Sequence, residues 1–162
     1  MPVSIPAGVE EGAALRIEGG GEAGERGGPR GDLYVVLSVQ PHEFFSRHGR
    51  DLQCEVPIPF TAAALGGEIA VPTLDGEDHL TLPPGTQTGR SFVLRGRGLP
   101  DARTGVRGSL HVVARVVTPR HLTQRQKELL AEFAGEGGDQ IDDPKGWFAR
   151  VRDALRGEDE NP

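Results

Sequence analysis

The sequence predicts a mainly β protein that contains a duplicated hairpin and ends in helices. Three observations support this fold class. The 162 residues include 24 glycines and 13 prolines, which is too many for a helical bundle. A segment of 35 residues recurs 77 positions further along the chain. After Pro119 the apolar residues change from alternation to a helical spacing.

The repeat aligns residues 5–39 with residues 82–116 without a gap, and 13 of the 35 positions are identical. About 3 identities would be expected by chance at this composition. Seven of the matches are glycine or proline, which fix the geometry of turns. Each copy therefore predicts a strand, a glycine-rich loop and a second strand. Residues 42–81 supply strands before the second copy, so we expect the chain to begin partway through its first domain.

Further strands are predicted by alternation of apolar and polar residues. Residues 33–39 alternate in this way, as a half-buried strand requires. Residues 52–60 alternate as well, but Pro57 and Pro59 remove two backbone donors. We therefore expect that strand to be short or to lie at a sheet edge.

The segment between these strands and the second copy of the repeat predicts a short helix and a hairpin. Residues 61–65 are mostly alanine and end at Gly66-Gly67, which indicates one or two helical turns. Asp75-Gly76 lies between two apolar runs and suits a tight hairpin turn.

Two helices are predicted after Pro119. Thr123 and Gln126 form a capping-box pattern, and the helix that follows would end at Gly135. A polar linker over 135–142 precedes a second amphipathic helix, which begins at Asp143-Pro144 and ends near residue 157. The predicted organisation is a first β domain (1–41), a second β domain (42–119), and a helical segment with an acidic, disordered tail (120–162).

Composition excludes several classes of protein. A net charge of −6 argues against nucleic-acid binding. The apolar runs are too short for a membrane span or a secretion signal. The single Cys54 rules out an internal disulfide and a zinc site built from cysteines. We therefore expect a cytoplasmic protein that contacts neither membrane nor nucleic acid.

The sequence contains no recognisable catalytic or metal motif. The spacing of His42 and His48 matches no metal site. Asp78-His79 lacks a nucleophile in the context that hydrolases use, and the glycine clusters lack the ending of a phosphate-binding loop. A hydrolase or lectin would need a polar site that is not found. The prediction is no enzyme, no metal and no cofactor.

The candidate functional features are apolar. Phe44 and Phe45 are adjacent in a polar segment, so one of them could be exposed as a binding residue, or both could cap the core. Trp147 and Phe148 lie on the second predicted helix. Their apolar face could pack on the same chain or on a second one.

Several segments together resemble the C-terminal client-binding region of DnaJ-type co-chaperones. They are Asp32–Leu52 with its Pro-His-Glu-Phe-Phe run, Ala63–Gly76 with Leu-Gly-Gly-Glu-Ile and Leu-Asp-Gly, and Leu82–Gly89. Leu122–Leu130 and Trp147–Val151 are similar to the dimerisation tail of bacterial members. The family's J-domain, Gly/Phe linker and zinc modules are missing, so ATPase stimulation and zinc binding are not expected of this chain. The resemblance suggests a truncated gene product or a misplaced start.

The resemblance implies two tandem β-sandwich subdomains, the first incomplete, followed by C-terminal amphipathic helices. It implies binding of unfolded client proteins, a homodimer, and a DnaK-type chaperone as partner of the full-length form. The implied client-binding residues are Leu15, Ile17 and Phe45, with Phe92 and Leu94 at the repeat-equivalent positions. The implied dimer contacts are Leu129, Leu130, Phe133, Trp147 and Phe148. The alternative is a purely structural oligomerisation module without client binding.

The expected truncation has a structural consequence. Without the early strands of the first subdomain, residues 5–39 should form a hairpin with an unpaired edge and an exposed apolar face.

Overall fold

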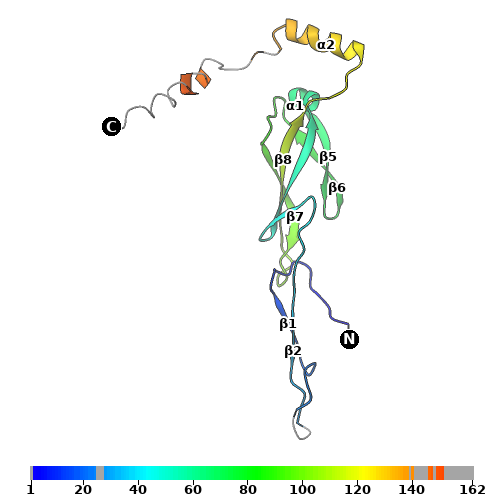
Figure 1. Cartoon of the computed structure of the whole chain (residues 1–162), viewed down its shortest axis with the longest axis vertical. Helices are drawn as coiled ribbons and strands as arrows, with labels where there is room; N and C mark the ends of the chain where they lie inside the picture. Colours follow the sequence, from blue (N-terminus) through cyan, green and yellow to red (C-terminus); the bar gives the residue numbers. More distant parts are fainter. Residues whose placement is uncertain (1, 25–27, 139, 141–145, 148, 152–162) are drawn as a thin grey trace, which may run out of the picture. The chain divides into compact units, whose positions relative to one another are not determined.

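The computed structural model confirms a mainly β fold with a C-terminal helix (Figure 1). It describes residues 2–24, 28–138, 140, 146–147 and 149–151. The chain divides into two units, Met1–Thr118 and Pro119–Pro162. The elements of the first unit are β1 (Ala14–Ile17), β2 (Leu33–Val36), β3 (Ser46–His48), β4 (Asp51–Pro59), α1 (Phe60–Leu65), β5 (Gly67–Thr73), β6 (Gly76–Leu82), β7 (Ser91–Pro100) and β8 (Arg107–Val117).

The first copy of the repeat forms a hairpin of β1 and β2. The antiparallel pairing places Leu15 opposite Val35 and Ile17 opposite Leu33. These side chains share one face of the hairpin, and none of them is fully buried. No third strand joins β1 and β2 in the described part of the chain. The expected hairpin with an unpaired edge is therefore confirmed. Its apolar face is only partly exposed, because Leu33 is exposed while the other three side chains are half-buried.

The second copy lies inside a four-stranded sheet with the order β3-β4-β8-β7. β7 and β8 are antiparallel, with Phe92 opposite Val112 and Leu94 opposite Leu110. This register equals that of β1 and β2 after a shift of 77 residues, so the repeat seen in the sequence is a repeat of structure. β8 also pairs with β4, and this pairing is parallel.

The hairpin of β5 and β6 completes a β-sandwich with this sheet. Val71 of β5 and Leu80 and Leu82 of β6 are buried in one core with β4, α1 and β8. The residues of β4 and β8 in this core are Leu52, Cys54, Val56, Ile58, Leu110, Val112 and Ala114. The hairpin turn is Leu74-Asp75, because Thr73 pairs with Gly76. The prediction of a tight hairpin at this place is confirmed.

The strand with two prolines also agrees with its prediction. β3 pairs with β4 only as far as Gln53. Among the described residues, the remainder of β4 therefore has β8 on one side and an open edge on the other. Pro57 and Pro59 lie in this part of the strand, where the missing backbone N–H donors destabilise the sheet least. β4 is nevertheless nine residues long, and Phe60 begins α1 instead of continuing the strand.

The second unit contains α2 (Gln124–Gly135). Thr123 accepts a hydrogen bond from the backbone N–H of Gln126, whose side chain accepts one from the N–H of Thr123. The predicted capping box is thus confirmed. Residues 146–147 and 149–151 are helical, while the ends of the second predicted helix and the acidic tail lie outside the described residues. No helix in the described part of the chain is long and apolar enough to cross a membrane.

Candidate functional site

An open pocket of about 750 Å³ lies beside Phe45 in the first unit. Three segments form it: the loop before β1, the connection from β2 to β4, and the tips of the strands around Leu74 and Leu99. The apolar lining residues are Val39, Pro41, Phe45, Leu52, Leu74 and Leu99. Charged or polar side chains at the pocket include Glu10, Glu11, His42 and Arg47. Such a combination of apolar walls and a few polar groups is typical of a ligand-binding site.

The side chain of His42 holds the backbone of both phenylalanines in a turn. The Nδ1 atom of His42 accepts hydrogen bonds from the backbone N–H of Phe44 (3.0 Å) and Phe45 (3.4 Å). The Phe44 side chain is 65% exposed, whereas Phe45 is partly buried against the core. The alternative that both phenylalanine rings cap the core is therefore wrong, because one of the two rings is exposed. Phe45 faces both the core and the pocket.

Arg47 fixes the loop before β1, which forms part of the pocket. Its guanidinium donates hydrogen bonds to the carbonyl oxygens of Val9 (2.6 Å), Gly8 (3.1 Å) and Gly49 (2.8 Å). Gly8 also lies close to the backbone of Pro100, because a Cβ built on Gly8 would be 1.8 Å from the Pro100 oxygen. Only glycine allows this approach. The loop before β1 is thus held against the sandwich.

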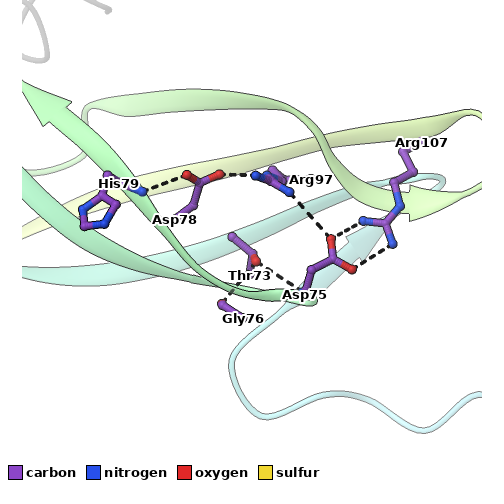
Figure 2. A network of polar contacts seen from close by, with 7 residues as sticks. All are labelled: Thr73, Asp75, Gly76, Asp78, His79, Arg97 and Arg107. Atoms are coloured by element: carbon purple, nitrogen blue, oxygen red, sulfur yellow. Dashed lines mark hydrogen bonds and ion pairs between the residues drawn. The ribbon is translucent and has the colours of Figure 1, made fainter.

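The turn of the β5–β6 hairpin contributes Leu74 to the pocket, and ion pairs surround this turn (Figure 2). Asp75 accepts hydrogen bonds from both terminal nitrogens of Arg107. These bonds from Arg107 lower the pKa of the Asp75 carboxyl. Asp78 accepts a hydrogen bond from the Nε of Arg97 at 2.7 Å. The pKa of Asp78 is lowered first by the backbone N–H of His79 and then by Arg97.

Only one of the five residues assigned to client binding lines this pocket. Phe45 does, whereas Leu15 and Ile17 lie half-buried on the face of β1. Phe92 and Leu94 lie on β7 and pack against the core, and the guanidinium carbon of Arg90 is 5.2 Å from the Phe92 ring centre. Of the three residues implied for the first subdomain, the pocket therefore contains Phe45 without Leu15 and Ile17.

Leu52, Leu74 and Leu99 are pocket residues that the sequence analysis does not assign. The one sequence signal that could have indicated Leu74 is a leucine in a Leu-Asp-Gly turn, because a polar residue would be usual there. Leu99 lies within the irregular stretch of β7 between Arg95 and Pro100, which a sequence pattern does not reveal.

The residues assigned to dimerisation are largely exposed where they are described. On α2, the side chains of Leu129 and Phe133 are 47% and 54% exposed, and Leu130 is half-buried. Trp147 is 54% exposed. Phe148 lies outside the described residues. Leu129 and Phe133 are four residues apart and so lie on one face of α2.

Comparison with known proteins identifies the family. Residues 1–119 match the family model of the DnaJ C terminal domain, and residues 125–157 match that of the chaperone protein DnaJ C-terminal region. The chain is 52% identical over 157 residues to the chaperone protein DnaJ of Shouchella clausii, covering 96% of this chain and 42% of that protein. It is 54% identical over 158 residues to the chaperone protein DnaJ of Geobacillus kaustophilus, covering 96% of this chain and 41% of that protein.

A relative with lower identity carries the same name. The chaperone protein DnaJ of Acetivibrio thermocellus is 47% identical over 156 residues, covering 96% of this chain and 40% of that protein. The chain thus spans about two fifths of the length of the relatives that it matches. A chaperone domain is not an enzyme, so that prediction is confirmed. The chain belongs to the family of DnaJ C-terminal domains, as its resemblance predicted.

Proposed function

We propose that this chain binds exposed apolar segments of unfolded proteins at the Phe45 pocket and dimerises through its C-terminal helices. The observation that carries the proposal is the open apolar pocket beside Phe45. Burial of apolar client side chains there would provide the binding free energy. An unfolded protein exposes apolar side chains along an extended backbone. A pocket with few specific polar groups can accept many such segments.

Dimerisation would strengthen binding at such a site. Leu129 and Phe133 present an exposed apolar face on α2, which a second copy of the chain could cover. Two linked sites can bind one client about 10²–10⁴-fold more tightly than one site. The dimer contacts implied by the resemblance, Leu130, Trp147 and Phe148 among them, belong to this proposal.

The relatives that this chain matches are named chaperone protein DnaJ, which supports a role beside a DnaK-type chaperone in the full-length form. We expect a cytoplasmic protein that needs no metal or other cofactor for client binding. We expect no binding to nucleic acid or membrane.

The first test compares two neighbouring phenylalanines. The probe is a fluorescein-labelled peptide with a Leu-Phe-Leu centre and Gly-Ser flanks, and the measurement is its Kd by fluorescence anisotropy. Replacing Phe45 with alanine should cost about 1–3 kcal/mol of binding, or about 5–150-fold in Kd. Phe44→Ala is the matched control, because Phe44 does not line the pocket, and it should change the Kd less than about twofold.

Circular dichroism and thermal unfolding establish that both variants are folded. Equal Kd values for the wild type and folded Phe45→Ala would contradict the proposal. The alternative, a structural oligomerisation module, predicts dimers in sedimentation equilibrium but no peptide binding and no suppression of aggregation of an unfolded protein.

A further inference from the structure

We infer that the turn of the β5–β6 hairpin, residues 73–76, is a lip of the Phe45 pocket that Asp75, Arg97 and Arg107 hold in place. Leu74 is the pocket residue of this lip. The three charged residues, which Figure 2 shows, are positioning residues. The inference rests on the proposed function, because it assigns a part of the binding site to a separate element of the fold.

The tip of this hairpin has little apolar packing of its own. Val71 and Leu80 are buried in the core, but no residue between them is buried. β5 and β6 pair only with each other within the described residues. An isolated pair of strands is marginally stable in water. The position of the tip therefore depends on side chains that reach it from other strands.

Two arginines from the neighbouring sheet provide these contacts. Arg107, at the start of β8, binds both carboxylate oxygens of Asp75, and the bond from Nη2 to Oδ1 is 3.0 Å long. Arg97 of β7 binds Asp78 through Nε at 2.7 Å and lies 3.9 Å from Asp75 through Nη1. Bidentate arginine–carboxylate pairs fix orientation as well as distance. The tip is thus connected to both β7 and β8.

The turn itself aims Asp75 at these arginines. The Thr73 hydroxyl donates a hydrogen bond to the Gly76 carbonyl (3.1 Å) and accepts one from the Asp75 N–H (3.3 Å). Because Leu74 directly precedes Asp75 in this closed turn, a fixed Asp75 carboxylate also restrains the backbone from which the Leu74 side chain extends.

One irregular stretch of β7 positions both Arg97, which pairs with the hairpin, and Leu99, which lines the pocket. The pairing of β7 with β8 shifts between Arg95 and Pro100, and Gly96 has a φ of 73° there. Arg97 from this stretch reaches the hairpin, and Leu99 lines the pocket. The backbone N–H of Leu99 donates to the Arg50 carbonyl at 2.8 Å, which holds the stretch in place.

The test uses the full chain and the labelled peptide described above, with four proteins: wild type, Arg107→Gln, Leu74→Ala and the double variant. Arg107→Gln should speed hydrogen exchange at residues 73–79 and raise the Kd about twofold to fivefold. Leu74→Ala should raise the Kd by a similar factor. The double variant should bind no more weakly than Leu74→Ala, because the arginine acts through the leucine.

Arg115→Gln is the matched control. It removes an exposed ion pair of the same strand, between Arg115 and Glu55 at 2.7 Å, and neither residue lines the pocket. This variant should change neither the Kd nor the exchange at residues 73–79.

The outcomes separate this inference from the proposed function. Unchanged exchange at residues 73–79 in Arg107→Gln overturns the inference, as does full additivity of the two single losses. A loss of binding in Phe45→Ala without one in Leu74→Ala overturns the inference alone. No loss in Phe45→Ala overturns the proposed function and this inference with it.

Discussion

The two copies of the repeated hairpin have the same strand pairing but different surroundings. Leu33 in the first copy and Leu110 in the second occupy equivalent positions, opposite Ile17 and Leu94 respectively. The Leu33 side chain is 40% exposed, while Leu110 is 0% exposed. β8 is covered by the β5–β6 hairpin and pairs with β4, whereas β1 and β2 pair only with each other in the described chain.

The difference shows that strand register in this fold is determined locally, whereas burial is determined by other parts of the chain. Equivalent glycines have left-handed backbones in both copies, with φ of 75° at Gly12 and 88° at Gly89, and 66° at Gly19 and 73° at Gly96. These turns, together with apolar alternation, are sufficient for the shared register. Burial depends instead on the strands that cover each hairpin.

The largest expected effect comes from truncating the equivalent leucines. Leu110→Ala should lower the free energy of unfolding by about 2–5 kcal/mol, because it leaves a cavity in a closed core. Leu33→Ala should cost less than about 1 kcal/mol, because that side chain already contacts water. Urea unfolding followed by circular dichroism measures both. Equal losses would show that the first hairpin is covered in solution.

A smaller effect is expected at the equivalent turn glycines. Gly8 and Gly85 have φ of 85° and 77°, so alanine costs about 1–2 kcal/mol of backbone strain at either position. Gly8→Ala should in addition push its loop away from Pro100, while a Cβ on Gly85 meets nothing within 4 Å.

Hydrogen exchange of the backbone amides measures the difference between Gly8→Ala and Gly85→Ala. Exchange in β1 and β2 should accelerate in Gly8→Ala and stay unchanged in Gly85→Ala. Unchanged exchange in both variants would mean that the contact of Gly8 with Pro100 does not hold the first hairpin.

The sequence predicts the hairpins, the short helix, the capping box and the proline-bearing edge, because each of these has a local signal. The parallel pairing of β4 with β8 has none, since alternation shows that a strand has a buried face but not which strand lies beside it. This pairing joins segments about 60 residues apart.

The pocket was predictable only in part for the same reason. Phe45 stands out as an apolar residue in a polar segment, and it lines the pocket. Leu74 and Leu99 come from two other segments, and the irregular stretch of β7 that carries Leu99 leaves no periodic pattern. The mapping of the repeat onto Phe92 and Leu94 is correct in register, but the cover that the second copy receives is not part of the repeat.

The smallest expected effect concerns acid sensitivity of the β5–β6 hairpin, which covers the second copy and not the first, through Asp75. Hydrogen bonds from Arg107 lower its pKa in the folded chain, so its stabilising contribution is present above the ordinary aspartate pKa of about 3.9 and is lost as the pH falls through the lower, folded value. The difference in unfolding free energy between the wild type and Asp75→Asn should therefore be largest near neutral pH and shrink toward pH 3 and below.

Urea unfolding at several pH values measures this difference in free energy. Addition of 0.5 M NaCl should also reduce the difference, because the Asp75–Arg107 pair is exposed. A difference that does not change with pH would mean that Asp75 stabilises the hairpin turn without the charge on its carboxylate.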